Sequence, residues 1–161
     1  MDFSREFMDE PFVTKLSSQD VVDEVIKSLG KEGLIDALKQ MLLVRHLETR
    51  GEAAYQQGLV GGFYHSYTGQ EAIQTGLVKA IGQDHWYVGF YRCHALAYLL
   101  GASPYEIMAE LYGKETGNAK GRGGSMHLYT DKMLGGFAIV GGQAPIACGA
   151  GFSIKIGRAH V

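Results

Sequence analysis

The stretch KGRGGSMH, residues 120–127, combines four glycine or serine residues with Lys120, Arg122 and His127. A loop of free backbone N–H groups with cations nearby can cradle a phosphate. The stretch does not match the nucleotide loop GxxxxGK(S/T), and it does not match a GxGxxG turn that opens a helix. Two interpretations therefore stay open, a phosphate cradle and an ordinary surface loop.

Tyr91 and Arg92 stand at the end of the aromatic, apolar stretch HWYVGFYR, residues 85–92. An arginine at the end of a buried segment needs a partner, because an unpaired buried charge costs several kcal/mol. The guanidinium group grips phosphate in a bidentate fork. The pair is therefore either an anion clamp or part of a structural salt bridge.

His65 lies between aromatic residues in a loop opened by Gly61 and Gly62, where a histidine serves either structure or catalysis. No two of the six histidines have HExxH spacing or another spacing typical of metal ligands. The chain has no GxSxG elbow and no pair of acids at an evident catalytic spacing. Residue types and spacing thus predict a phosphate-bearing ligand in a glycine-rich cleft and leave the reaction open.

Apolar spacing predicts a long helix from Lys31 to Gln57, after a shorter helix that Ser17 or Ser18 caps and Gly30 ends. The face expected to be buried consists of Leu34, Ile35, Leu38, Met41, Leu42 and Ala54. The charged residues expected largely outside this face are Arg45, Glu48, Arg50 and Glu52. We interpret this half of the chain as a helical support without chemistry.

The helices and loops expected to hold the candidate residues in place follow after Gly58. A capping box at Ser103 and Glu106, with Pro104 at the first helical position, is the strongest start signal. The expected elements are a glycine-rich aromatic loop, a helix over 70–81, a short strand or extended segment over 85–92, a helix through 96–100, a capped helix to Tyr112, a long loop over 113–127, a glycine stretch over 134–145 and a helix from Pro145.

Composition bounds the class of protein. The chain has 161 residues and is 46% hydrophobic, which suffices for a core. A net charge of −2 without a basic block argues against nucleic acid or an anionic membrane as partner, and no apolar run approaches the roughly 18 residues of a membrane span. The acidic start resembles no secretory or transit signal, so we expect a cytoplasmic protein. Cys93 and Cys148 stand far apart in the sequence, so we expect reduced cysteines without a disulfide framework or a zinc site.

Four motifs occur in one order: MLLVRHLETRGEAAYQQGLVGGFYHSYTGQEA (41–72), YVGFYRCHALAYLLG (87–101), AELYGKETGNAKGRGGSMHLY (109–129) and LGGFAIVGGQAPIACGAG (134–151). Over about residues 34–155 the chain resembles the alpha subunits of the thiamine-diphosphate-dependent 2-oxo acid dehydrogenases. GGFYH followed by TGQEA favours the pyruvate dehydrogenase branch over the branched-chain enzymes. Acetoin dehydrogenase alpha subunits are nearly as similar.

The resemblance implies that Tyr91 and Arg92 bind the cofactor, with the arginine on its diphosphate. It implies that Ala138 and Val140 cradle the aminopyrimidine, although Ala138 stands where many relatives have glycine. His65 matches a catalytic histidine at the substrate end of the active-site channel.

The resemblance also implies a mainly architectural role for KGRGGSMH, and it assigns no role to His94 or His127. The Gly-Asp-Gly motif and the asparagine that bind Mg²⁺ in the family match nothing up to Lys155, so we expect no metal ligands in this chain. Residues 156–161 fit no position of the family and read as a translated sequencing adapter, which indicates a non-native tail.

The implied activity is oxidative decarboxylation of pyruvate, with acetyl transfer to a lipoyl group on the lipoyl domain of an acyltransferase. A beta subunit in a heterotetramer is expected to supply the acid that activates thiamine diphosphate, so the chain alone is expected to be inactive. Two alternatives stay open, an acetoin dehydrogenase alpha subunit and a truncated, non-catalytic chain that binds the beta subunit.

The implied fold class is α/β. The chain would be the N-terminal, helix-rich part of a thiamine-diphosphate-binding fold, truncated before most of the central parallel sheet. The expected division is an arm and short helix over residues 1–33, the thiamine-diphosphate-binding domain over 34–155 and the tail over 156–161.

Overall fold

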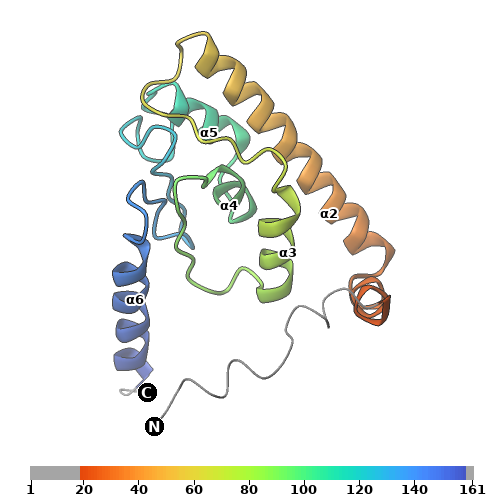
Figure 1. Cartoon of the computed structure of the whole chain (residues 1–161). Helices are drawn as coiled ribbons and strands as arrows, with labels where there is room; N and C mark the ends of the chain where they lie inside the picture. The colour runs from red at the N-terminus through yellow and green to blue at the C-terminus, as the bar shows by residue number, and fades with distance from the viewer. Residues whose placement is uncertain (1–18, 159–161) are drawn as a thin grey trace. The chain divides into compact units, whose positions relative to one another are not determined.

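The computed structural model describes residues 19–158, and the chain separates into two compact units at residues 38 and 39. Five helices make up its regular structure (Figure 1): α2 (Gln19–Gln56), α3 (Glu71–Ile81), α4 (His94–Leu99), α5 (Pro104–Leu111) and α6 (Gln143–Arg158). No helix in this part of the chain is both long and apolar enough to cross a membrane.

Residues 19–158 form no extended strand, and their β pairing is limited to two isolated bridges, Tyr87 with Met133 and Thr130 with Met133. The described chain is therefore helix-rich, as expected for the beginning of the family's domain. The parallel sheet expected for the whole fold stays a prediction.

Gly30 interrupts α2 with φ 62° and ψ 178°, a left-handed conformation that favours glycine. The sequence predicts a break at this residue, and the break is confirmed. The predicted polar arm over residues 1–16 and the predicted cap at Ser17 or Ser18 lie outside the described residues.

The buried face of α2 differs from the predicted face. Its buried residues are Val44, Leu47, Glu48, Gly51 and Ala54, whereas Leu34, Ile35, Leu38 and Leu42 are exposed. The prediction is confirmed for Ala54 and wrong for these four leucine and isoleucine residues, because the helix carries apolar residues on several faces and its packing partners select one of them. Val44 packs with Tyr67 and Ala95, and Ala54 packs with Val60 and Leu111. Glu48, expected outside, is fully buried.

The capping box that the sequence predicts at the start of α5 is confirmed. The Ser103 hydroxyl accepts from the Glu106 backbone N–H at 3.2 Å, and Glu106 Oε2 accepts from the Ser103 N–H at 2.8 Å. Pro104 occupies the first helical position. The cap fixes the direction of α5, and thereby the position of Glu110 near its end.

The extended segment, residues 85–92, pairs with residues 132–135 over a short distance. The Tyr87 N–H donates to Lys132 O at 2.8 Å, its carbonyl accepts from Leu134 N at 2.9 Å, and Gly89 N donates to Gly135 O at 2.8 Å. An added Cβ at Gly89 would lie 2.6 Å from the terminal methyl of Met133, so a larger residue there would require this side chain to move. The pairing joins the segment that ends in Arg92 to the segment that precedes Ala138.

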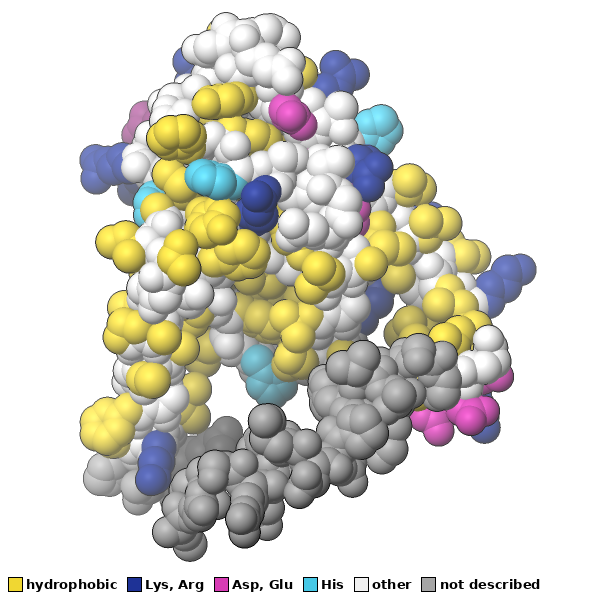
Figure 2. Space-filling view, in the orientation of Figure 1, with side chains coloured by type: hydrophobic (Ala, Val, Ile, Leu, Met, Phe, Trp, Pro, Cys, Tyr) yellow, Lys and Arg dark blue, Asp and Glu magenta, His cyan; other side chains and the backbone are white. Residues whose placement is uncertain are grey.

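α6 starts at Gln143, two residues before the predicted start, and presents apolar side chains to the surface (Figure 2). Phe152 is 66% exposed, and Ile146, Ile154 and Ile156 are also exposed. Cys148 on this helix is an exposed free thiol, whereas Cys93 is a buried one whose pKa burial raises to about 12. The helix therefore offers an apolar surface, and Cys93 is an unreactive core residue.

Arg45 of α2 and Glu71, the first residue of α3, form a two-point ion pair. Arg45 Nε lies 2.5 Å from Glu71 Oε1, Nη2 lies 3.0 Å from Oε2, and the Gly69 N–H donates to Oε1 at 3.0 Å. The hydrogen bond from Arg45 lowers the pKa of Glu71 to about 2, although burial opposes the shift. The pair anchors the end of the aromatic loop, residues 58–69, to α2.

Acidification is expected to remove the contribution of this pair to stability. The pKa of Glu71 is lower in the folded chain than its ordinary value of 4.5, so the contribution is present above about pH 5 and is lost as the pH falls toward 2. Urea unfolding between about pH 6 and about pH 3 should show a steeper loss of stability for the unmodified chain than for Glu71→Gln. Parallel pH curves for the two proteins would contradict this expectation.

Candidate functional site

The structure brings His65 of the aromatic loop together with Tyr91 and Arg92 of the extended segment. The His65 and Tyr91 rings lie 4.6 Å apart between centroids, at an angle of 54°. The Arg92 guanidinium carbon lies 5.8 Å from the centre of the Tyr91 ring. Three side chains that the sequence singles out, from segments 26 residues apart, therefore share one location.

Arg92 is half-buried, and its partners are backbone groups. Its Nη1 donates to the Ser66 carbonyl, and its own carbonyl accepts from Gln74 Nε2 at 3.4 Å. Among residues 19–158 no carboxylate forms an ion pair with it. The salt-bridge interpretation of Arg92 is therefore not supported, and its positive charge stays available for an anion.

His65 Nδ1 is a buried polar atom without a hydrogen-bond partner in the described chain. Phe63 and Tyr91 flank the imidazole ring, with the Phe63 centroid at 6.2 Å. An unpaired buried polar atom costs about 1–3 kcal/mol, which a bound polar group would relieve. His65 Nδ1 is therefore placed to form a hydrogen bond with a polar group beside Tyr91.

Ala138 and Val140 lie three and five residues beyond Gly135, the glycine whose carbonyl accepts from Gly89. Val140 is 84% exposed and its neighbour Ile139 is 78% exposed, so the segment presents an open apolar surface. The structure connects this segment to Tyr91 and Arg92 through the backbone pairing of residues 87–89 with 132–135.

The glycine loop, residues 113–127, has its backbone N–H groups turned away from solvent. The N–H groups of Ala119, Gly121, Gly123 and Gly124 all donate to the carboxylate of Glu110, at 2.6–3.3 Å. The interpretation of KGRGGSMH as a phosphate cradle is therefore wrong, because an internal anion already occupies these donors. Sequence reasoning missed Glu110, since a glutamate on a helix before a loop ordinarily faces solvent.

Glu48 and His94 form a buried pair that the sequence analysis also missed. His94 Nδ1 lies 2.9 Å from Glu48 Oε1 and 3.2 Å from Oε2, and both side chains are almost fully inaccessible. Burial raises the pKa of Glu48, but the hydrogen bond and charge of His94, with a hydrogen bond from Tyr64, outweigh it and the net pKa is lowered. Glu48 is therefore a carboxylate in the core.

The other ring nitrogen of His94, Nε2, lies 2.8 Å from the Ser125 carbonyl. The carbonyl and the carboxylate are both hydrogen-bond acceptors, and they lie at opposite nitrogens of the ring. The signal that could have revealed the pair is the position of Glu48, which lies one residue after Leu47 and three before Gly51 on the face that packs. A charge on that face requires a partner.

Tyr64 joins this pair to the aromatic loop. Its hydroxyl donates to Glu48 Oε2 at 2.7 Å, and its ring stacks on His94 with centroids 5.1 Å apart. Burial and the negative charge of Glu48 raise the pKa of Tyr64, so the hydroxyl keeps its proton. An added Cβ at Gly51 would lie 2.3 Å from the Tyr64 hydroxyl oxygen, which explains a glycine inside α2.

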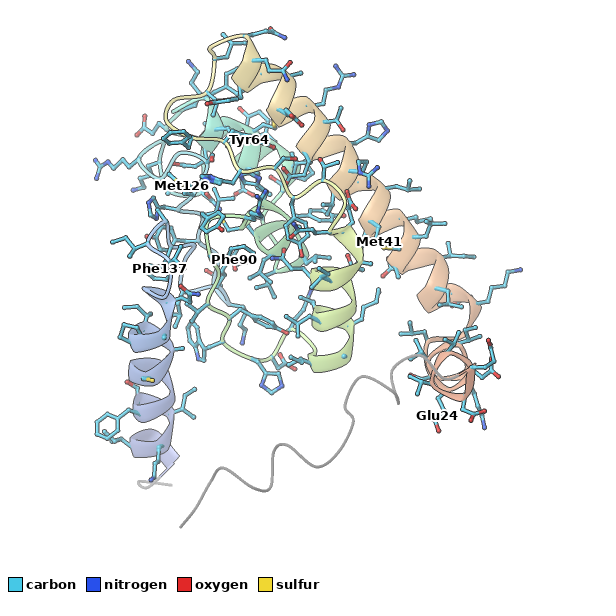
Figure 3. All side chains as sticks on the ribbon, in the orientation of Figure 1. Glu24, Met41, Tyr64, Phe90, Met126 and Phe137 are labelled. Carbon is cyan, nitrogen blue, oxygen red and sulfur yellow. The ribbon has the colours of Figure 1, made fainter. Side chains whose placement is uncertain are left out.

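The aromatic loop and the glycine loop are therefore held together at several points. Figure 3 labels Tyr64 on the first and Met126 on the second, and the Ser125 hydroxyl donates to the Phe63 carbonyl at 2.6 Å between them. His127 Nδ1 donates to the Gly136 carbonyl at 2.9 Å. His94 and His127 thus have structural roles that the sequence left unassigned, since both secure the loops beside the candidate site.

The part of the chain from 19 to 158 contains no group of three or more His, Cys, Asp or Glu that could hold a metal ion. Three carboxylates of the described chain, those of Glu48, Glu71 and Glu110, have hydrogen-bond partners within the protein. The described site is therefore cationic and apolar, and suits an anionic ligand.

Comparison with known proteins shows which family has the same sequence pattern. The family model described as "Dehydrogenase E1 component" matches residues 39–160. A mitochondrial pyruvate dehydrogenase E1 component subunit alpha from Dictyostelium discoideum is 44% identical over 129 residues, which are 80% of this chain and 34% of that protein. The mitochondrial subunit alpha from Kluyveromyces lactis is 40% identical over 82% of this chain and 32% of its own.

A third relative, the type I mitochondrial subunit alpha of Ascaris suum, is 38% identical over 149 residues, 92% of this chain and 37% of that protein. The chain spans about a third of the length of the curated relatives it matches. The match includes all four motifs that surround His65, Tyr91, Arg92 and the glycine loop.

Proposed function

Because this chain belongs to the dehydrogenase E1 component family, we propose that it is part of the alpha subunit of a pyruvate dehydrogenase and contributes to a thiamine diphosphate site. The names of the relatives favour pyruvate over acetoin as substrate. The observation that carries the proposal is the position of Arg92, a half-buried cation without a carboxylate partner in the described chain, beside Tyr91 and His65.

The residues present fit the anionic end of the cofactor. Arg92 commits one guanidinium nitrogen to the Ser66 carbonyl, and its remaining N–H groups suit diphosphate oxygens. Because Ser66 directly follows His65, this hydrogen bond also fixes the distance between the cation and the histidine. Arg92 would therefore bind the diphosphate, and Tyr91 would orient the guanidinium through its ring.

The apolar segment around Ala138 and Val140 fits the aminopyrimidine end. Its open surface offers backbone groups and the exposed side chains of Ile139 and Val140, and an alanine at 138 leaves the backbone groups in place. Thiamine diphosphate, when bound, supplies the electron sink that allows a 2-oxo acid to lose carbon dioxide. The role of this chain is to bind and orient, with His65 Nδ1 free to hydrogen-bond a polar atom of the substrate.

Magnesium finds no ligand set in residues 19–158. A magnesium ion that accompanies the cofactor would therefore be held by residues other than those described. We also propose that the complete fold is α/β with a central parallel sheet. The helix-rich structure of this chain and its family membership support that proposal.

A beta subunit and a lipoyl domain are the proposed protein partners. The exposed apolar residues of α6, among them Phe152 and Ile154, support the need for a covering surface. A cytoplasmic location stays a prediction from the composition, and fractionation of the source cells would test it.

The experiment that tests the proposal compares the affinity of this chain for thiamine diphosphate and for thiamine, which lacks the phosphates. Because Arg92 provides the anion contact, we expect Arg92→Ala to weaken thiamine diphosphate binding by about tenfold to a hundredfold, the value of one charge-assisted contact, with little effect on thiamine. Isothermal titration calorimetry with magnesium present measures both affinities.

Arg122→Ala is the matched control, because Arg122 is exposed and belongs to the glycine loop whose N–H groups Glu110 occupies. We expect this variant to bind thiamine diphosphate like the unmodified chain. Equal losses in the two variants, or equal affinities for thiamine and thiamine diphosphate, would contradict the assignment of Arg92 as the diphosphate ligand.

A further inference from the structure

We propose that residues 119–124 form a carboxylate-binding nest with Glu110 as its built-in occupant, and that this carboxylate is the positioning residue for the loops beside the candidate site. The inference concerns Glu110 and does not depend on which cofactor or substrate the protein uses. It assigns a role to a side chain that lies outside the contacts of His65, Tyr91 and Arg92.

Within residues 19–158, the Glu110 carboxylate accepts hydrogen bonds from four backbone N–H groups of the glycine loop. Oε2 accepts from Ala119 at 2.8 Å and from Gly121 at 2.9 Å. Oε1 accepts from Gly123 at 2.6 Å and from Gly124 at 3.3 Å. The side chain is 0% exposed, and no basic side chain pairs with it in residues 19–158. Four N–H dipoles therefore take the place of a counter-ion.

The loop around the Glu110 carboxylate is packed too closely for a side chain at Gly117 or Gly121. An added Cβ at Gly117 would lie 2.3 Å from Glu110 Oε2, and one at Gly121 would lie 2.6 Å from the Gly113 carbonyl. Gly121 and Gly124 have φ of 73° and 59°, and Lys120, which directly precedes Gly121, has φ 57°. Successive left-handed residues turn neighbouring N–H groups toward one point, which is the geometry of an anion nest.

The nest determines where the next residues of the chain lie. Ser125 follows Gly124 directly, and its carbonyl accepts a hydrogen bond from His94 Nε2. His127 lies two residues further and donates to the Gly136 carbonyl, two residues before Ala138. The Glu110 carboxylate thus fixes a loop that reaches both the Glu48–His94 pair and the segment proposed to cradle the aminopyrimidine.

The nature of the nest distinguishes it from ordinary core packing. A glutamine at 110 has the same shape, but one of its two polar atoms is an NH₂ donor that would face backbone donors. A pocket beside the nest is lined by Gly121, Arg122, Gly123 and Gly124 as well as by Glu110. Removal of the side chain would therefore leave donors that a small external carboxylate could reach.

The test is chemical rescue in this chain. We expect Glu110→Ala to lower the urea midpoint of unfolding, and we expect formate to restore most of the loss while formamide, a neutral molecule of similar size, restores none. Glu115→Ala is the matched control, because Glu115 is an exposed carboxylate of the same loop, and neither molecule should change its midpoint selectively. If Glu110→Ala is unfolded without additive, refolding in formate but not in formamide is the expected result.

Amide hydrogen exchange provides a second readout. In the unmodified chain the N–H groups of Gly121 and Gly123 should be protected, and Glu110→Gln should reduce this protection by about tenfold or more. The proposal is overturned if Glu110→Gln keeps the protection, if formate and formamide act alike on Glu110→Ala, or if neither of them has an effect.

Discussion

Replacement of Glu48 by alanine is expected to lower the free energy of unfolding by about 3–5 kcal/mol, the usual cost of removing one member of a buried ion pair. His94 would keep a single acceptor, the Ser125 carbonyl, and its Nδ1 would have no partner in the core. The Tyr64 hydroxyl would also lose its closest acceptor, Glu48 Oε2 at 2.7 Å. The large effect follows because His94 is only 1% exposed and cannot replace the lost partner with water.

Urea unfolding followed by circular dichroism measures this change, with Glu52→Ala as the matched control. Glu52 lies one turn further along α2 and is exposed, so its loss should change stability by less than about 0.5 kcal/mol. The double variant with His94→Ala should be less unstable than the sum of the two single variants, because removal of both partners leaves no unpaired charge. Additive losses, or equal effects of Glu48→Ala and Glu52→Ala, would show that the pair is not an ion pair.

Gly123→Ala is expected to destabilise the chain by about 3 kcal/mol or more, because the new methyl group has no room. Its Cβ would lie 2.0 Å from the His127 carbonyl oxygen and 3.0 Å from the His127 carbonyl carbon. Both atoms belong to the backbone of His127, whose side chain forms a hydrogen bond with the Gly136 carbonyl. The loop must therefore shift, and the 2.6 Å hydrogen bond from Gly123 to Glu110 is lost with it.

Gly149→Ala is the matched substitution. Gly149 lies inside α6, and an added Cβ there would meet no atom within 4 Å. Alanine is the better helix former, so this variant should be stabilised by up to about 1 kcal/mol. Urea unfolding of both variants measures whether the two substitutions change the free energy of unfolding in opposite directions. A Gly123→Ala variant as stable as the unmodified chain would show that the glycine loop is not packed as described.

Local signals in the sequence predict a substantial part of the fold. The break at Gly30, the capping box of α5 and the long loop after Gly113 depend on residues close together in the chain, and the structure contains all three. The extended segment over 85–92 is also present, although it forms a single bridge at Tyr87 instead of a strand. Short-range rules suffice where turn and cap chemistry decides the conformation.

The buried face of α2 and the two internal carboxylates could not be predicted in the same way. Glu48 meets His94 across 46 residues, and Glu110 meets Gly123 across 13, so the partner of each is known only once the chain has folded. The composition of α2 permits more than one buried face, and periodicity alone selects the wrong one. In both cases a charge that reads as a solvent-facing side chain is a core element.

In the candidate site, too, the sequence predicts some features and not others. His65, Tyr91 and Arg92 are predicted from residue types and from the family resemblance, and the structure brings them together. The glycine loop is the counterexample, since its composition suggests a phosphate cradle while its donors bind Glu110. A glycine-rich sequence predicts an anion nest correctly here, but the anion comes from the protein itself.

The central claim is that the anion site lies at Arg92 and not in the glycine loop. A titration of the ¹⁵N-labelled chain with thiamine diphosphate, followed by NMR, tests it most directly. We expect the largest shifts at the Arg92 side-chain N–H and the Tyr91 amide, while the amides of Gly121 and Gly123 stay unchanged. The largest shifts at these glycine amides, with an unchanged Arg92 signal, would contradict it.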